Sequence, residues 1–137
     1  MITAVDTNIL LDVFLPDPKF GECSAVALEE AEAAGSLVIC EPVYAELAVR
    51  FPTKIKLDDA LAELQIAVEP VSLDASWLAG KALAAYRNAG GKRERIITDF
   101  LIGAHAQKRC TRLLTRDRGF YRSYFKTLVV FEPITGA

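Results

Sequence analysis

The chain opens with Met1-Ile2-Thr3-Ala4-Val5-Asp6-Thr7-Asn8-Ile9-Leu10-Leu11, in which a short apolar run ends at an aspartate. We expect residues 2–5 to form a buried strand, since a short apolar run bounded by polar residues is typical of a strand inside a sheet. A short helix is predicted over residues 8–15, because Pro16-Asp17-Pro18 stops any continuation. This opening therefore places a carboxylate directly after the end of a strand.

The rest of the chain repeats this alternation of short strands and helices. Further strands are predicted over residues 37–40, 67–71, 112–115 and 127–131, and helices over residues 20–34, 42–51, 56–66, 74–88 and 98–109. Gly90-Gly91 opens a basic loop, Lys92-Arg93-Glu94-Arg95. The pattern predicts an α/β fold with a central, mostly parallel sheet of about five strands and helices on both faces. Without a linker or repeat, residues 1–137 are expected to form a single domain.

Composition narrows the class of protein. The chain has 137 residues, of which 52% are hydrophobic, so a sizeable core is available and a disordered chain is excluded. No apolar run approaches the roughly 20 residues that a membrane span needs, and we expect no membrane partner. The three cysteines, Cys23, Cys40 and Cys110, form no CxxC pair. Reduced thiols in a cytoplasmic protein are therefore favoured over a zinc site.

Charge is divided unevenly along the chain. Residues 1–86 hold 5 Lys and Arg against 14 Asp and Glu, whereas residues 87–137 hold 11 against 4. Such asymmetry indicates either a polyanionic partner or two solvated faces of opposite sign.

Four acidic residues fall where an open parallel sheet binds its ligands, beyond the carboxyl ends of the strands. Asp6 follows the first strand, Glu46 lies one turn into the helix after the second, Asp99 begins the helix before strand 112–115, and Asp117 follows that strand. Crowded, buried carboxylates repel one another and stay ionised only beside cations. Oxygen ligands suit Mg²⁺ or Mn²⁺, and such an ion can activate water against a phosphodiester bond.

Each acid also has a simpler interpretation. Asp6 and Asp99 could cap the helices that they precede or begin. Glu46 could pair with Arg50 on a solvated helix face. Asp117 could be a turn residue before Gly119. Each alternative is credible alone, but accidental convergence of all four acids is much less so.

Four segments together resemble one family of nucleases. They are Val5-Asp6-Thr7-Asn8-Ile9-Leu10-Leu11-Asp12, Pro42-Val43-Tyr44-Ala45-Glu46-Leu47, Thr98-Asp99-Phe100-Leu101-Ile102-Gly103-Ala104-His105-Ala106 and Leu113-Leu114-Thr115-Arg116-Asp117-Arg118-Gly119-Phe120. In this order and at these separations they resemble the PIN-domain nucleases, and in particular a VapC-type toxin of a type II toxin–antitoxin pair. The resemblance covers residues 2 to about 131 and implies a single PIN-like domain over residues 1–137.

The resemblance implies a metal-dependent endoribonuclease that hydrolyses RNA with a metal-activated water. It carries the family's acids onto Asp6, Glu46, Asp99 and Asp117, with Asp6, Asp99 and Asp117 as ligands to Mg²⁺ or Mn²⁺ and the Thr115 hydroxyl as a catalytic helper. Family members often carry a further acid after the last aspartate, whereas Arg116 and Arg118 flank Asp117 here. Asp117 could therefore act through water. We expect RNA contacts from four residues, Asn8, Arg95, Arg116 and Arg118.

The resemblance also implies partners, namely a cognate antitoxin protein and a second copy of the chain in a homodimer. The alanine-rich stretches 23–34 and 75–85 offer either a partner groove or packing surfaces. The alternative function is a catalytically inactive module that binds RNA or protein. A phosphatase of the haloacid-dehalogenase type is disfavoured because Asn8 stands where its second aspartate belongs.

The remaining polar and aromatic residues are expected to have simpler roles. His105, the single histidine, is predicted to be packed or half-exposed. Surface charge is predicted for Asp12, Asp17, Asp58 and Asp59. Among the aromatic residues, Tyr86, Phe120, Tyr121, Tyr124 and Phe125 could stack on bases, although core packing is expected for at least half of them.

Overall fold

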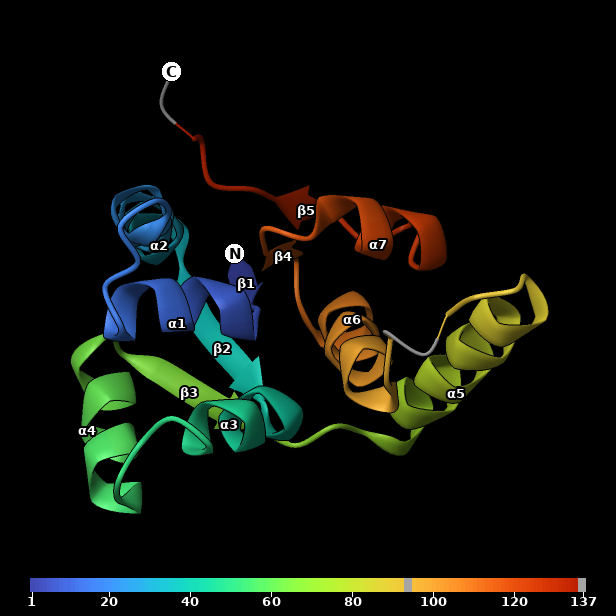
Figure 1. The fold of residues 1–137 in the computed structure, drawn as a ribbon, viewed down its shortest axis with the longest axis horizontal. Coiled ribbons are helices and arrows are strands. Elements are labelled where there is room, and N and C mark those ends of the chain that lie inside the picture. The colour runs from blue at the N-terminus through green and yellow to red at the C-terminus, as the bar shows by residue number, and fades with distance from the viewer. Residues whose placement is uncertain (93–94, 136–137) are drawn as a thin grey trace.

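The computed structural model describes residues 1–92 and 95–135 and contains one parallel sheet in the order β3-β2-β1-β4-β5 (Figure 1). The strands are β1 (Ile2–Val5), β2 (Ser36–Cys40), β3 (Ile66–Glu69), β4 (Arg112–Leu114) and β5 (Val130–Phe131). All four strand pairs are parallel. The predicted fold class is therefore confirmed.

Strand β1 lies at the centre of the sheet because its side chains can be buried on both faces. Ala4 is opposite Val38 of β2 on one side and Leu113 of β4 on the other. Ala4 and Val5 are 3% and 1% exposed, so the apolar run at the start of the chain is the middle of the core.

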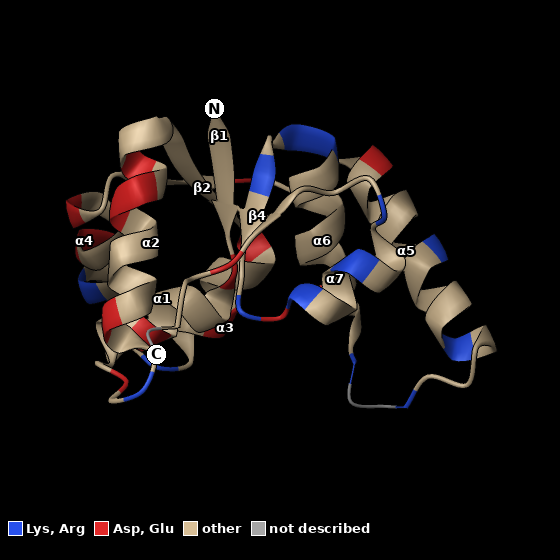
Figure 2. Ribbon diagram, turned by 90° about the horizontal axis from the view of Figure 1, so that it is seen from above, with Lys and Arg blue, Asp and Glu red and all other residues tan. Residues whose placement is uncertain are grey.

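The helices cover both faces of the sheet. Their bounds are α1 (Thr7–Phe14), α2 (Gly21–Ala34), α3 (Glu41–Ala48), α4 (Lys54–Glu63), α5 (Leu73–Asn88), α6 (Ile97–Arg109) and α7 (Arg118–Tyr124). Figures 1 and 2 show α1, α2 and α4 on one side of the sheet and α5 and α6 on the other, with α5 packed along α6. No helix within the described parts of the chain is both long enough and apolar enough to cross a membrane.

Most predicted elements are present with shifted ends, and both shifts of α4 have a local cause. Helix α4 begins two residues earlier than predicted because the Thr53 side chain accepts a hydrogen bond from the Lys56 backbone N–H. It ends earlier because Gln65 adopts a left-handed backbone with φ of 55°. Strand β5 has only two residues, and helix α7 was not predicted at all.

The charge asymmetry of the sequence is also an asymmetry in space. Figure 2 shows acidic residues gathered on α2 and α4, and basic residues on α5, α6, α7 and their connections. Arg93 and Glu94 of the predicted basic loop lie outside the described residues.

The strand order creates a switch point between β1 and β4. From β1 the chain moves to β2 and β3 on one side, and then returns to β4 on the other side of β1. The loops that leave β1 and β4 therefore diverge, which leaves room at the carboxyl ends of these two strands.

Candidate active site

Asp6 occupies the switch point and bridges β1 to β4. Its backbone N–H donates to the Leu114 carbonyl at 2.9 Å. Its carboxylate accepts hydrogen bonds from the Thr7 backbone N–H at 2.7 Å and from the Thr115 hydroxyl at 2.7 Å. Asp6 thus caps α1, as the simpler interpretation predicted, but the contact with Thr115 exceeds what capping requires.

Glu46 reaches the same edge of the sheet from α3. Its Oε1 accepts a hydrogen bond from the Thr7 hydroxyl at 2.6 Å. Thr7 thus links the two acids, because its side chain binds Glu46 and its backbone N–H binds Asp6. No ion pair joins Glu46 to Arg50, both of which the structure describes. The alternative interpretation, in which Glu46 pairs with Arg50 on a helix surface, is therefore wrong.

The Asp6 carboxylate is held in an environment that disfavours its charge. Burial raises the pKa of Asp6 to about 6, and the nearby Glu46 carboxylate adds to this effect. The Thr115 hydroxyl, the Thr7 backbone N–H and the nearby Tyr121 hydroxyl act in the opposite direction and lower the pKa. These groups are neutral, so they do not compensate the charge of the carboxylate.

Asp99 and Asp117 complete the predicted set from the α6 and β4 sides. Asp99 accepts a hydrogen bond from the Ile96 backbone N–H at 3.2 Å, so it does cap α6, as its simpler interpretation had it. Burial raises the pKa of Asp99, and Asp117 contributes to the rise. The Asp117 carboxylate pairs with the Arg95 guanidinium, while its backbone N–H donates to the Thr115 hydroxyl at 3.0 Å.

The four acids share one edge of the sheet without closing tightly around a point. Across residues 1–92 and 95–135, a group of three or more Asp, Glu, His or Cys ligand atoms lying within 4.8 Å of one another occurs elsewhere, at Glu69, His105 and Cys110. Among the described residues, the carboxylates at the switch point therefore do not form so tight a group. Mg²⁺ usually keeps several waters and is bound by only one or two carboxylates, so a tight group is not required.

Tyr121 is a residue of this edge that the sequence analysis did not assign to it. Its side chain is 1% exposed, and its hydroxyl lies against the Asp6 carboxylate. Burial and the charges of Asp6, Asp99 and Asp117 raise the pKa of Tyr121 well above its ordinary value. Tyr121 thus feels the charge of three of the four acids and keeps its proton, so its hydroxyl can act as a neutral donor toward Asp6.

Asp12 was predicted to be a surface charge, and this prediction is wrong. Asp12 is 4% exposed and accepts hydrogen bonds from Arg116 Nε at 2.7 Å and Nη2 at 3.0 Å. The Ser24 hydroxyl donates to it at 2.7 Å, and the Arg116 guanidinium stacks on the Phe20 ring at 4.0 Å. Arg116, which we expected to contact RNA, is thus held in a structural ion pair.

The other predicted polar residues have mixed positions. The Asn8 side chain accepts from the Arg116 backbone N–H at 3.3 Å and reaches Asp6 Oδ2 at 3.4 Å. Arg118 is half-exposed and lies 3.4 Å from Glu132. His105 is buried, as one predicted alternative had it.

The aromatic residues of the second half mainly form core. Phe120, Tyr121 and Phe125 are buried, and Phe100 packs edge-on against Phe120 with ring centroids 5.1 Å apart. Tyr86 and Tyr124 join this cluster with centroids 5.4 Å apart. The expectation of core packing for at least half of them is confirmed.

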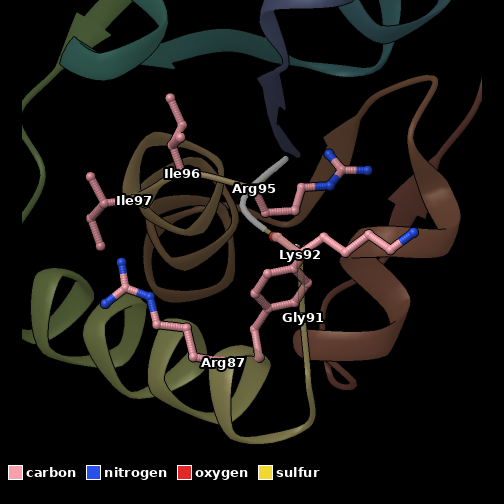
Figure 3. A pocket seen from close by; sticks show the side chains of 7 residues that line it. Arg87, Gly91, Lys92, Arg95, Ile96 and Ile97 are labelled. Carbon is pink, nitrogen blue, oxygen red and sulfur yellow. Dashed lines mark hydrogen bonds between the residues drawn. The ribbon is translucent and has the colours of Figure 1, made fainter.

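Figure 3 shows a pocket of basic lining, hereafter the basic pocket, whose volume is about 670 Å³. Its cationic side chains are those of Arg87, Lys92 and Arg95, and Ile96 and Ile97 supply its apolar wall. Arg95 belongs to both places, because it lines the pocket while its guanidinium pairs with Asp117. The basic pocket therefore adjoins the acidic edge at Arg95.

Comparisons with solved structures give a consistent fold. VapBC2 from Rickettsia felis bound to a DNA fragment of its promoter superposes with a TM-score of 0.74 at 19% identity, covering 98% of this chain and 100% of the other. VapBC-1 from nontypeable Haemophilus influenzae gives 0.71 at 20% identity, covering 96% and 98%. A toxin–antitoxin complex from Klebsiella pneumoniae gives 0.63 at 23% identity, covering 98% and 99%.

No curated protein sequence shows significant similarity to the chain. The sequence profile of the PIN domain, however, matches residues 3–126, which include all four acids and Tyr121. The chain belongs to the PIN-domain family.

Proposed function

We propose that this protein is an Mg²⁺- or Mn²⁺-dependent endoribonuclease and the toxin of a toxin–antitoxin pair. The proposal rests on the environment of Asp6, a buried carboxylate at the switch point whose hydrogen-bond donors are neutral. Glu46 is its acidic neighbour, and Asp99 and Asp117 act with Asp6 on Tyr121. A carboxylate in this setting favours either a proton or an added cation.

The donors at this edge fit a hard divalent ion. The four acids offer carboxylate oxygens and Thr115 adds a hydroxyl oxygen, and Mg²⁺ and Mn²⁺ prefer oxygen ligands. Asp6 would hold the ion directly, and Asp99 and Asp117 would hold it directly or through water. Such an ion, when bound, lowers the pKa of a water and stabilises the charge that develops on phosphate oxygens.

The chain's own residues orient these groups. The Thr115 hydroxyl donates a hydrogen bond to the Asp6 carboxylate and accepts one from the Asp117 backbone N–H, which fixes both acids relative to β4. Thr7 fixes Glu46 in the same way relative to α1. Glu46, placed near Asp6 but outside its hydrogen bonds, is suited to accept a proton from an attacking water.

Substrate binding is assigned to the basic pocket. A phosphate beside the acidic edge would meet Arg95, and the next phosphates along the strand would meet Lys92 and Arg87. Arg118, half-exposed at the start of α7, can add a further contact. That the strand is RNA rests on the family resemblance.

The partners are also part of the proposal. The similar solved structures named above are VapBC and toxin–antitoxin complexes, which supports a cognate antitoxin for this chain. We further propose that the protein forms a homodimer. Co-expression with the small protein encoded beside it, followed by measurement of the mass of the purified complex, tests both points. Purification of a lone monomer would contradict them.

The central experiment is cleavage of a labelled RNA by purified protein with EDTA, Mg²⁺ or Mn²⁺. We expect cleavage with either metal and none with EDTA, and loss of cleavage in Asp6→Asn but not in Asp59→Asn, a change at an exposed aspartate on α4. RNA binding without cleavage in every metal would instead favour the alternative, an inactive binding module of the same fold.

Arg95 provides a separate test of substrate binding. Replacing Arg95 with Gln removes one phosphate contact, so we expect weaker RNA binding and a shallower dependence of affinity on salt by about one unit of slope. The matched control is Arg109→Gln, which removes an exposed arginine from the far end of α6. Equal effects of the two changes would contradict the assignment.

A further inference from the structure

Three potential metal ligands meet at a place that the proposed nuclease mechanism does not use. Glu69 ends β3, His105 lies on α6, and Cys110 is the residue that caps the end of α6. His105 Nε2 lies 3.0 Å from Glu69 Oε1, and together with the Cys110 sulfur these ligand atoms all lie within 4.8 Å of one another.

The ligand types and distances suit zinc. Imidazole nitrogen, thiolate sulfur and carboxylate oxygen are the three donors that Zn²⁺ takes from proteins, at about 2.0–2.3 Å. Tetrahedral geometry with such bonds sets neighbouring donor atoms about 3.3–3.7 Å apart. The observed spacing therefore needs only small side-chain shifts to surround an ion. Mg²⁺ and Ca²⁺ would be poorly served by sulfur and nitrogen.

The cluster is already held in place by its surroundings. His105 is 1% exposed, so its ring has little freedom to turn. Arg109 Nη2 binds the other carboxylate oxygen, Glu69 Oε2, at 2.9 Å. Glu69 Oε1 can thus face an ion while Arg109 continues to orient the carboxylate, in the manner of residues that support metal ligands from outside.

The cluster is partly open to solvent. Glu69 and Cys110 are half-buried, and Glu69 also lines a groove of about 470 Å³ along β2 and β3. Binding of a divalent cation would displace the thiol proton of Cys110.

We propose that Glu69, His105 and Cys110 bind one Zn²⁺, with water as the fourth ligand. The ion would join the edge strand β3 to α6, two elements that are distant in sequence. Its role is structural, since it lies apart from the acids at the switch point. The sequence analysis favoured reduced thiols over a zinc site, because cysteine spacing alone carries no sign of a glutamate 41 residues before Cys110.

Cobalt substitution tests the proposal. Reduced, metal-free protein is titrated with Co²⁺, whose bond to a thiolate gives a charge-transfer absorption in the near ultraviolet that oxygen ligands cannot give. We expect this band to saturate at one equivalent and to disappear when Zn²⁺ is added. It should be absent in Cys110→Ser and unchanged in Cys23→Ser, a half-buried cysteine whose thiol contacts the Phe20 carbonyl. Glu69→Gln should keep the band with at least tenfold weaker Co²⁺ affinity.

A second measurement needs no variant. Zn²⁺ should protect Cys110 of the wild-type protein, but not Cys23, from alkylation by iodoacetamide, as read by mass spectrometry. A missing cobalt band in the wild type, a band that persists in Cys110→Ser, or equal alkylation of both cysteines with and without Zn²⁺ would each overturn the proposal. The Cys110→Ser and Cys23→Ser variants should cleave RNA in Mg²⁺ at the same rate. Failure of the zinc proposal can therefore be distinguished from failure of the proposed nuclease function.

Discussion

Helix α1 carries a buried carboxylate near each of its ends, and the two are treated in opposite ways. Asp6 is 6% exposed and Asp12 is 4% exposed. Asp12 receives two hydrogen bonds from the Arg116 guanidinium and one from Ser24. Asp6 receives its bonds from the Thr7 backbone, the Thr115 hydroxyl and, at 3.4 Å, the Asn8 amide, all of them neutral.

The difference separates a structural carboxylate from a reactive one. Removing a carboxylate from water costs several kcal/mol unless a cation compensates its charge. The fold supplies that cation to Asp12 as Arg116. Among the described residues no Lys or Arg forms an ion pair with Asp6, so its charge is left to be met by a proton or a metal ion.

Replacing Asp6 with Asn should have the largest effect on activity. We expect RNA cleavage to fall about 1,000-fold, because the chain would lose its most direct ligand to the ion. The free energy of unfolding at pH 7 should stay the same or rise, since a poorly compensated charge is removed from the interior. Cleavage rates in Mg²⁺ and urea unfolding provide the two readouts. If the Asp6→Asn variant were unfolded, or cleaved RNA as fast as the wild type, Asp6 would not differ from Asp12 in the way proposed.

Replacing Asp12 with Asn should have the reverse pattern. Arg116 would lose its anion while only 29% of its side chain is exposed, so we expect a loss of about 2–3 kcal/mol in the free energy of unfolding. The control is Asp58→Asn, which breaks the exposed pair with Lys54 and should cost less than about 1 kcal/mol. If urea unfolding gave equal losses for the two variants, the Asp12 pair would have no special structural weight.

The comparison also predicts a pH dependence of stability. Folding raises the pKa of Asp6 from 3.8 to about 6, so the unfolded chain releases this proton at lower pH than the folded protein. Stability from this group is therefore lost as pH rises from 4 to 7, by about 2 kcal/mol. Asp6→Asn should lack that loss, so the difference in unfolding free energy between variant and wild type should grow with pH. Parallel curves for the two proteins would show that Asp6 ionises normally.

The sequence predicted those parts of the fold that depend on local patterns. The apolar runs at residues 2–5 and 37–40 become β1 and β2 almost to the residue, because short buried strands need apolar side chains on both faces. Helix α7 escaped prediction for a physical reason. It is a single short helix whose residues Phe120 and Tyr121 are fixed by packing on Phe100 and on each other, rather than by a long amphipathic repeat.

The same limit applies to the site. Positions near strand ends follow from chain order, so Asp6, Glu46, Asp99 and Asp117 could be predicted from the sequence as candidate site acids. The ion pair of Asp12 could not be predicted, because its partner Arg116 lies 104 residues further along the chain. An aspartate in an apolar helix looks the same in sequence whether an arginine reaches it or not.

Tyr121 is the member of the acidic edge that only tertiary structure reveals, and it gives the smallest predicted effect. Replacing it with Phe removes a neutral donor beside Asp6, a change worth about 1–1.5 kcal/mol, so we expect RNA cleavage to fall about tenfold while the fold is kept. Tyr124→Phe is the matched control, because Tyr124 packs in the same aromatic cluster and should change cleavage less than about twofold. The Tyr121 hydroxyl also lowers the pKa of Asp6, so its loss should move the ionisation of Asp6 upward and shift the low-pH limb of the cleavage profile in the same direction. An unshifted profile with full activity would mean that Tyr121 serves the core alone and that Asp6 is set by Thr7 and Thr115.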